Sequence, residues 1–477
     1  MNWFVIFFFV VLLTSRFFSE TLAVLPKAMD IVDLAVIPLL LVFSLLSSDN
    51  RGVDLGLHRR IFRLVCVFTL LWAISWAANL DRVIYPAAVL FLFGMLEGPL
   101  LFLALNRLIR NKRKFGLQMA RIIGIMVLVE AAAVIFVNIP IFAATGNPDV
   151  ISGTFGNNPY QFSAFLIVMG GFYLGRMRVS TKSIIYGVVI QIFIFGTFIL
   201  LQWRTATPAF FASYLVLLGI LYGRRILRLS LIVAVLAAIG YYIFSFIQTS
   251  DLNLKYEDLA VIYENPTSLA DIGKVLSYVN TVEMYSEEPT TILVGSGPGT
   301  YVSRANYIFS IEASAEKTKG VSQIIRAVFG DEPYSTEVSN RFIRPLYDME
   351  ARFGSMQSNN PASSVLAAGA ETGIPGLVVI GMIYGAVLIN AIRFLRYSLS
   401  ILDRQLISLS SALVIGTVYL CIICLLDNYL EISRVTLPVW LLLWTVSVLV
   451  RDQRVTRANE AILRRNLEVH ELATVAQ

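Results

Sequence analysis

The residues best suited to chemistry in this sequence are arginines at the edges of apolar segments. Arg204 stands in a very short polar turn, 202–205, between two apolar runs, and Arg82 and Arg434 occupy comparable positions. An arginine side chain presents a planar fork of N–H donors that matches a phosphate or diphosphate group. The alternative role is a helix-end anchor at a membrane surface. We therefore take Arg204 as a candidate catalytic residue and Arg82 and Arg434 as candidate substrate-binding residues.

Carboxylates are the candidates for proton transfer. Glu371 lies in a stretch of small residues, 367–373, that leads into a long apolar segment. A buried carboxylate is a stronger base than an exposed one, which suits general acid–base work. A hydrogen bond at a helix end is the alternative role for Glu371. Asp348 and Glu350 are further candidate bases, and Arg341, Arg344 and Arg352 beside them are candidate substrate-binding residues.

Two other features admit either a binding or a structural role. Gly295, Gly297 and Gly299 form a glycine-rich turn after a short apolar run, and such a turn could cradle a phosphate through backbone N–H groups or be needed for positive φ. No Gly-Lys-Ser/Thr follows, so the turn is not a P-loop. Glu97 and Glu130 lie inside apolar segments, where they could bind substrate or stabilise helix contacts.

Metal and cofactor chemistry has little basis in the composition. His58 and His470 are the only histidines, and both fall in segments that we place on the cytoplasmic side. The opposite side therefore has no histidine for a metal site or for a Ser-His-Asp triad. We predict no metal and no cofactor.

The elements that position these residues are predicted to be transmembrane helices. Hydrophobic residues make up 57% of the 477 residues and charged residues only 15%, against about 25% charged in a soluble protein. Using roughly 20 residues as the length of a membrane span, we expect an all-α polytopic membrane protein with about twelve helices. The expected spans are approximately 1–15, 28–48, 61–79, 83–106, 119–143, 161–175, 183–201, 208–223, 229–247, 363–392, 405–426 and 435–450.

Basic residues cluster in alternate loops, which predicts the orientation. Cytoplasmic loops carry an excess of Lys and Arg, so both termini are expected inside and the loop 250–362 outside. No nucleic-acid partner is expected, because the short basic loops account for the net charge of +6. The basic groups are Arg51, Arg59 and Arg60; Arg107, Arg110, Lys112, Arg113 and Lys114; Arg176, Arg178 and Lys182; Arg224, Arg225 and Arg228; and Arg393, Arg396 and Arg404.

The loop from Ser250 to Ala362 divides the chain into parts. It holds nine Lys or Arg and fifteen Asp or Glu residues, and irregular backbone of this length cannot face lipid. We expect nine transmembrane helices in 1–249, a mainly helical periplasmic loop in 250–362, three transmembrane helices in 363–450, and a basic cytoplasmic tail in 451–477. Such a loop is more typical of an enzyme with a membrane-tethered substrate than of a transporter.

Four segments resemble motifs of the bacterial O-antigen polymerase and O-antigen ligase superfamily, membrane enzymes related to C-type glycosyltransferases. Segment 152–164, Ser-Gly-Thr-Phe-Gly-Asn-Asn-Pro and onward, is similar to a small-Gly-x-Phe-x-Asn-Pro motif and includes Asn157, a candidate substrate-binding residue. Segment 203–206 is similar to a Ser-Arg-small motif. Segment 293–301 is similar to a Gly-x-Gly-x-Gly-aromatic turn, and 360–376 to Pro-His-Asn … Ala-Glu-x-Gly-hydrophobic-x-Gly.

The resemblance implies a metal-independent, inverting glycosyl transfer on the periplasmic face of the bacterial inner membrane. The donor would be a glycan on undecaprenyl diphosphate, and Arg204 would bind the diphosphate. A polymerase transfers to another lipid-linked repeat unit, and a ligase to lipid A-core or another acceptor. Membrane lipids and a chain-length regulator are further implied partners.

One position departs from the motif, because Ala362-Ser363 stands where the ligases resembled here have His-Asn. We therefore expect a polysaccharide polymerase, with an O-antigen ligase and a nonenzymatic transporter or glycan-assembly factor as alternatives.

Overall fold

The computed structural model describes residues 2–22, 24, 38, 40, 42, 55–109, 111–156, 158–178, 181–201, 206–223, 273–309, 336–342 and 363–475. Within these ranges all regular secondary structure is helical, which confirms the predicted all-α class. The elements are α1 (Asn2–Arg16), η1 (Phe17–Thr21), α3 (Leu55–Ala78), α4 (Tyr85–Leu108), α5 (Lys112–Ala133), η3 (Val134–Asn138), α6 (Ile139–Thr145), η4 (Pro148–Val150), α7 (Pro159–Met177), α8 (Thr181–Leu200), α9 (Ala206–Tyr222), α12 (Gly273–Glu287), α13 (Thr291–Val294), α14 (Arg304–Phe309), α17 (Glu337–Phe342), α19 (Ser364–Ile401), α20 (Arg404–Leu426) and α21 (Ser433–Val475).

Seven helical stretches among the described residues are long and apolar enough to cross a membrane. Two shorter apolar helices, α8 and α9, accompany them. The protein is therefore a helical membrane protein. Expected span 229–247 lies outside the described residues and 28–48 lies almost wholly outside them, so twelve spans remain a prediction. The seven stretches are Trp3–Thr21, Gly56–Ala78, Tyr85–Leu108, Lys112–Thr145, Ser364–Ile401, Arg404–Leu426 and Ser433–Leu463.

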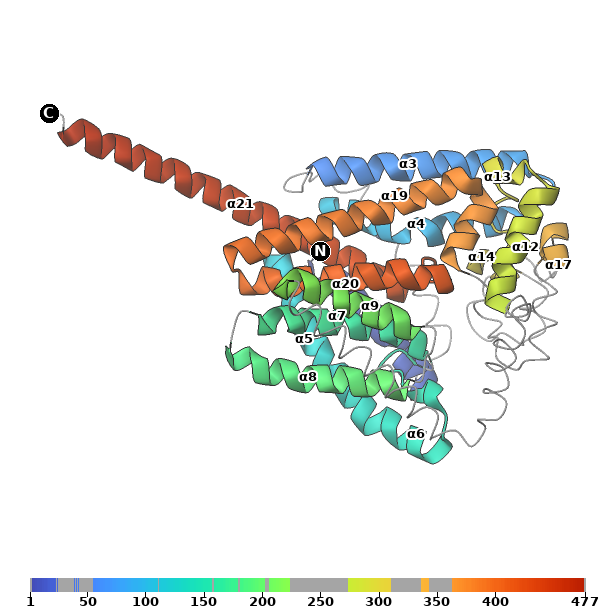
Figure 1. Cartoon of the computed structure of the whole chain (residues 1–477), viewed down its shortest axis with the longest axis horizontal. Helices are drawn as coiled ribbons and strands as arrows, with labels where there is room; N and C mark the ends of the chain where they lie inside the picture. The colour runs from blue at the N-terminus through green and yellow to red at the C-terminus, as the bar shows by residue number, and fades with distance from the viewer. Residues whose placement is uncertain are drawn as a thin grey trace.

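The last helix shows the largest difference from the predicted boundaries. The apolar pattern predicts a span that ends near Val450, whereas α21 continues to Val475 and projects far beyond the bundle (Figure 1). Hydropathy reports only the apolar part of a helix. The charged continuation of α21 has no such signal and was predicted as a tail.

Small residues allow the central helices to pack closely. Gly171 and Gly175 of α7 are spaced as a Gly-x-x-x-Gly pair and face α20. A Cβ atom on Gly171 would lie 2.3 Å from Cγ2 of Ile415, and one on Gly175 would lie 2.5 Å from Oγ of Ser411. Helices in membranes associate largely through such close backbone packing. The pair therefore places α7 directly against α20 in the centre of the bundle.

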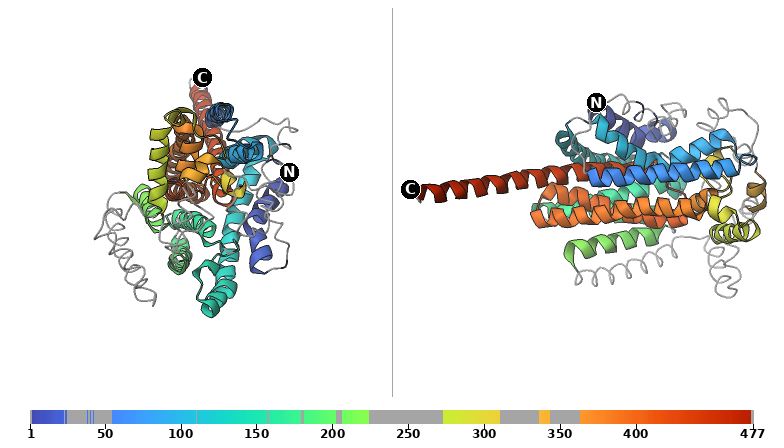
Figure 2. Two further views of the ribbon diagram at one scale, coloured as in Figure 1. Left: turned by 90° about the vertical axis from the view of Figure 1, so that its right-hand side faces the viewer. Right: turned by 90° about the horizontal axis from the view of Figure 1, so that it is seen from above.

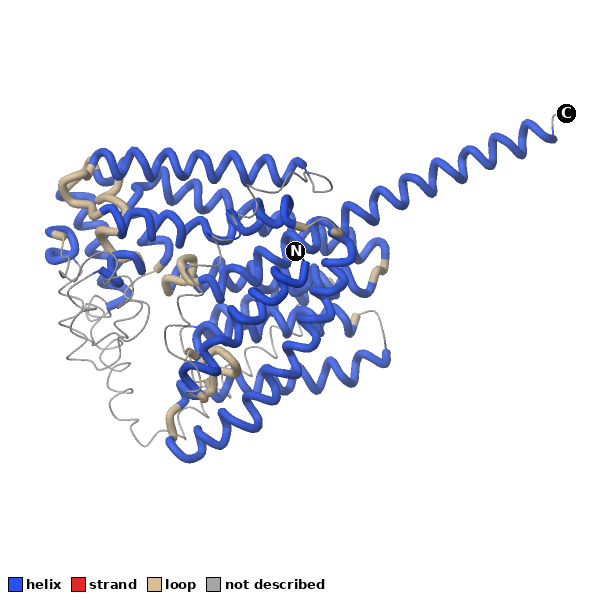
Figure 3. The backbone as a smooth tube through the Cα atoms, turned by 180° about the vertical axis from the view of Figure 1, so that it is seen from behind, coloured by secondary structure: helices blue, strands red, loops and turns tan. Residues whose placement is uncertain are grey.

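The two ends of the bundle differ in character. Helices α12, α13, α14 and α17 gather at one end, which we name the α12 end, and α21 projects from the other (Figures 1 and 2). Figure 3 shows that the described loops lie at the ends of the long helices. At the opposite end Arg113 pairs with Asp452 (3.3 Å), and Arg454 lies over the ring of Tyr397 (4.7 Å). These contacts join the start of α5 and the end of α19 to the charged part of α21.

Candidate functional site

The glycine turn, residues 295–301, docks into the α12 end through its three glycines. A Cβ atom on Gly297 would lie 2.4 Å from Cγ2 of Val83, and one on Gly299 would lie 2.7 Å from Cβ of Ala87. Residues other than glycine would therefore meet steric conflict as well as backbone strain. The predicted need for positive φ is confirmed at Gly295 (+76°), Gly297 (+107°) and Gly299 (+79°).

The carboxylate of Glu371 is the main anchor of this turn. Its Oε1 accepts backbone N–H groups from Tyr301 (3.0 Å) and Ser303 (2.8 Å), and its Oε2 accepts the N–H of Gly299 (2.5 Å). The side chain is fully buried. A carboxylate that accepts several backbone donors is tightly held. This geometry favours the helix-end hydrogen-bonding role over the general-base role for Glu371.

A break in α19 leaves backbone groups of this helix available to the glycine turn. Gly373 has φ +73° and ψ 172°, which interrupts the helix. The carbonyl oxygen of Ala370, one turn before the break, instead accepts the backbone N–H of Ser296 (2.8 Å). A Cβ atom on Gly373 would lie 2.5 Å from the carbonyl oxygen of Leu293. The break therefore allows both backbone hydrogen bonding and close approach between α19 and the turn.

Pro375 leaves a second carbonyl of α19 without its helical donor, because proline has no N–H group. That carbonyl belongs to Glu371 and accepts the hydroxyl of Ser75 on α3 (2.7 Å). Asn79, one turn later, donates to the carbonyl oxygens of Ser75 (2.8 Å) and Gly295 (3.2 Å). Helix α3, the glycine turn and the broken helix thus form one hydrogen-bonded unit.

A second junction lies at the start of α19. The hydroxyl of Ser364 accepts backbone N–H groups from Tyr429 (2.9 Å) and Leu430 (3.0 Å) in the loop 427–432 between α20 and α21. The hydroxyl of Ser363 accepts a hydrogen bond from Tyr278 of α12 (2.9 Å). The loop 427–432 is therefore fixed against the position where α19 begins.

Two further buried carboxylates lie at the α12 end. Glu97 accepts hydroxyl groups from Ser433 (2.6 Å) and Thr436 (2.5 Å). Glu431, in the loop 427–432, accepts a longer bond from Nδ2 of Asn428 (3.4 Å) and is 6% exposed. Burial, together with the nearby charge of Glu371, raises the pKa of Glu431 to about 8.

The predicted arginines divide between the surface and the interior. Arg82 pairs with Glu288 (2.6 Å), which raises the pKa of Arg82. Arg341 pairs with the adjacent Glu287. Both arginines therefore pair with acids at or next to the end of α12, and both remain partly exposed. Arg434 is fully buried and donates to the carbonyl oxygen of Leu12 (2.7 Å) and to Ser15 (2.9 Å), which ties α21 to α1.

Several predicted residues fall elsewhere. Glu130 is buried and accepts the N–H (2.7 Å) and hydroxyl (2.6 Å) groups of Thr154, so it holds part of segment 152–164. Sequence reasoning missed Ser75 and Glu431; for Glu431 the available signal was an acid in a short polar loop between apolar segments. The predicted site residues outside the described part of the chain are Arg204, Asp348, Glu350, Arg344, Arg352 and Asn157, and their roles stay predictions.

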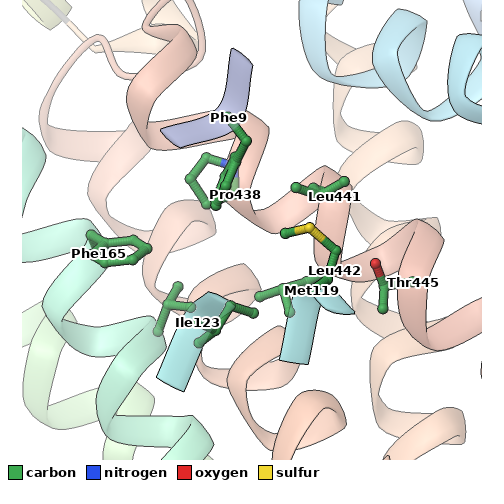
Figure 4. Close-up of a pocket in the computed structure, with 9 residues that line it drawn as sticks. Phe9, Met119, Ile123, Phe165, Pro438, Leu441, Leu442 and Thr445 are labelled. Carbon is green, nitrogen blue, oxygen red and sulfur yellow. The ribbon is translucent and has the colours of Figure 1, made fainter. Parts of the chain in front are cut away.

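A small cavity inside the bundle offers no substrate site. Its lining is apolar and includes Phe9, Met119, Phe165 and Leu442 (Figure 4). Its volume is about 10 Å³ for the centre of a water molecule, which is about the minimum for one water. We regard it as a packing defect. Among the described residues, no group of three His, Cys, Asp or Glu side chains is arranged to hold a metal ion.

Comparison with known proteins adds no family. No protein-family model matches the sequence, and the comparison with curated proteins finds no significant match. The class defined by the fold alone is a helical membrane protein with a docked, partly helical region at one end of its bundle.

Proposed function

We propose that the protein is a membrane-embedded glycosyltransferase that polymerises lipid-linked glycan repeat units. The observation that carries the proposal is the contact between the glycine turn and the segment around Glu371. Both segments resemble motifs of the same superfamily, and they lie about 70 residues apart in the sequence. Glu371 itself accepts three backbone N–H groups of residues 299–303. The two motif-like segments thus belong to one structural unit at the α12 end.

The proposed chemistry needs positive charge for a diphosphate leaving group, a base for the acceptor hydroxyl, and a protected site. Arg204 is proposed to bind the diphosphate of the undecaprenyl carrier, with help from Arg341. Arg341 is 55% exposed, and its ion pair with Glu287 is therefore open to exchange with a phosphate. Arg82, paired with the adjacent Glu288, offers a second and less exposed guanidinium.

The same proposal assigns the location and the acceptor. The α12 end would face the periplasm and the basic opposite end the cytoplasm, in the inner membrane of a bacterium. The acceptor would be another lipid-linked repeat unit. A ligase that transfers to lipid A-core is the second candidate, and Ala362 at the histidine position of the ligase-like motif favours the polymerase.

Glycan from a deletion strain tests the proposal. A polymerase predicts that single repeat units replace long chains on a gel. Full-length chains that stay on the carrier lipid would instead support a ligase, and unchanged glycan would refute both. When the deletion strain expresses Arg204→Ala at the wild-type level, polymer formation should be about a hundredfold or more lower than with the wild type. One well-placed donor contributes roughly 3–4 kcal/mol to such a reaction. Normal chain lengths in that strain would refute the role of Arg204.

A further inference from the structure

We propose that α13 lies in the lipid interface at the α12 end, inserts Ile292 and Leu293 among the lipid chains, and so holds the glycine turn at headgroup depth. The partner of this surface is the lipid of the surrounding bilayer. The inference does not depend on the proposed glycosyl transfer. Three observations support it: the continuity of exposed apolar side chains between a membrane span and α13, the level of the membrane edge, and the types of residue at that level.

Helix α13 packs its backbone against two membrane spans. It lies beside the ends of α3 and α19 (Figure 1). A Cβ atom on Gly373 of α19 would lie 2.5 Å from the carbonyl oxygen of Leu293. Asn79, directly after α3, donates to the carbonyl oxygen of Gly295, where α13 ends (3.2 Å). The side chain of Leu293 nevertheless is 67% exposed, and Ile292 beside it is also exposed. The helix therefore turns two large apolar side chains away from the protein.

These side chains continue an exposed apolar stripe of α19. Ile374, Val378 and Met382 are exposed and recur at every fourth residue, so they share one face of the helix. Because α19 is long and apolar enough to cross the membrane, lipid is the solvent for this face. The stripe begins at Ile374, next to the glycine that Leu293 approaches. A single exposed leucine is common on a protein surface, but one that continues a lipid-facing stripe indicates contact with the same lipid.

The level of the membrane edge can be counted from the opposite end of the two spans. Exposed arginines there, Arg393 on α19 and Arg60 and Arg63 on α3, mark the boundary with water. About 20 helical residues cover the hydrocarbon core. Counted from Arg393, this length reaches Gly373. Counted from Arg60 or Arg63, it ends in the turn 80–83. Both spans therefore place the other edge of the hydrocarbon at the level of α13.

The residues at this level are of the types found at a membrane interface. The ring of Trp76, near the end of α3, lies 5.8 Å from that of the exposed Tyr85, and tryptophan and tyrosine are enriched at membrane–water boundaries. Leu80, between them in the sequence, is 66% exposed. The partly exposed ion pair of Arg82 and Glu288 follows on the polar side. Apolar, aromatic and charged groups thus occur together where α13 meets the two spans.

The test uses the full-length protein in vesicles of phosphatidylethanolamine and phosphatidylglycerol, with its three native cysteines replaced by alanine. Leu293→Cys, Val378→Cys and Asn459→Cys each carry one nitroxide label. Collisions of the label with oxygen, which concentrates in hydrocarbon, are compared with collisions with a water-soluble nickel chelate. Asn459, on the part of α21 beyond the bundle, is the reference for water.

The label at Leu293 should collide more with oxygen than with nickel, as the label at Val378 does. Its preference for oxygen should be smaller, because Val378 lies five residues beyond Gly373, which is about 7 Å deeper at roughly 1.5 Å per residue. An interfacial helix enters the boundary between headgroups and chains by about 5–10 Å.

A label at Leu293 that prefers nickel, as the label at Asn459 should, would place α13 in water and overturn the inference. A label shielded from both reagents would mean that protein covers this surface, and would overturn it equally. If Leu293→Cys does not fold, a label at Leu80→Cys must prefer oxygen, and a preference for nickel there would overturn the inference. These measurements do not involve glycan, so failure of the proposed function would leave their outcome unchanged.

Discussion

Replacing Glu371 with glutamine tests whether its carboxylate anchors the glycine turn or transfers a proton. A glutamine can place its amide oxygen at the Oε1 position and keep the bonds from Tyr301 and Ser303. Its NH₂ group then faces the N–H of Gly299, so two donors point at each other with no acceptor between them. The substitution therefore removes one hydrogen bond to a charged acceptor and leaves one buried N–H without an acceptor.

The size of the effect follows from that lost bond. A hydrogen bond to a charged group contributes about 1.5–3 kcal/mol, and a loss of about 2 kcal/mol corresponds to a change of about 30-fold, because 1.4 kcal/mol is tenfold. The amide hydrogen of Gly299 should therefore exchange with deuterium about 30 times faster in Glu371→Gln. The amide of Leu366, bonded to Ser363, serves as an internal reference.

The exchange and transfer measurements together separate the two roles. An anchor predicts faster exchange at Gly299, and any loss of glycosyl transfer should accompany it. If glycosyl transfer falls while the Gly299 amide exchanges as slowly as in the wild type, the anchoring role is refuted and Glu371 is again a candidate base. Glu371→Ala removes all three bonds, so it should cost about 4 kcal/mol or more and lower the melting temperature in detergent.

Three further predictions concern stability, measured as the melting temperature in detergent. Gly295→Ala should lower the free energy of unfolding by about 3 kcal/mol or more, because Gly295 has positive φ and its Cβ atom would lie 2.4 Å from α19. Gly381→Ala is the matched control: its Cβ atom would meet nothing within 4 Å, so it should raise the free energy of unfolding by up to about 1 kcal/mol. Ser75→Ala should lower the free energy of unfolding by about 1–2 kcal/mol, because the carbonyl of Glu371 loses its donor. Thr69→Ala should be nearly neutral, because the carbonyl that Thr69 contacts keeps its helical N–H donor. Equal losses of stability in the two variants would contradict this argument. The pKa of Glu431 rises from 4.5 to about 8 on folding, so the native state holds a proton that the unfolded state has lost. The wild type should therefore lose stability relative to Glu431→Gln as pH rises from about 5 to about 8, and a constant difference would argue against burial of this carboxyl.

The sequence predicted those features of the fold that depend on local pattern. Apolar length located α19 and α20 to within a few residues at their starts, because a membrane span requires a continuous apolar run. The positive φ of Gly295 was one of the two roles that the glycine-rich turn allowed. The end of α21 could not be predicted from hydropathy, since its last turns are polar.

The candidate site depends on contacts that no local pattern contains. Glu371 was selected for its buried position, but its donors lie 68–72 residues away and follow a glycine turn. The bond from Ser75 to the carbonyl of Glu371 spans 296 residues. Pro375 gave an indirect signal, because a proline in a helix leaves a carbonyl that some other group must satisfy. Only the structure identifies that group.

The junctions at the glycine turn and at Ser364 hold both ends of the chain segment between Phe309 and Ser363. Closing a chain between two fixed points costs entropy that grows only with the logarithm of the number of residues between them, so doubling that number costs about 0.6 kcal/mol. Insertions or exchanges within this segment therefore carry a small thermodynamic penalty for the helix bundle. The length of chain between the two junctions can therefore change while the contacts of the helix bundle stay the same.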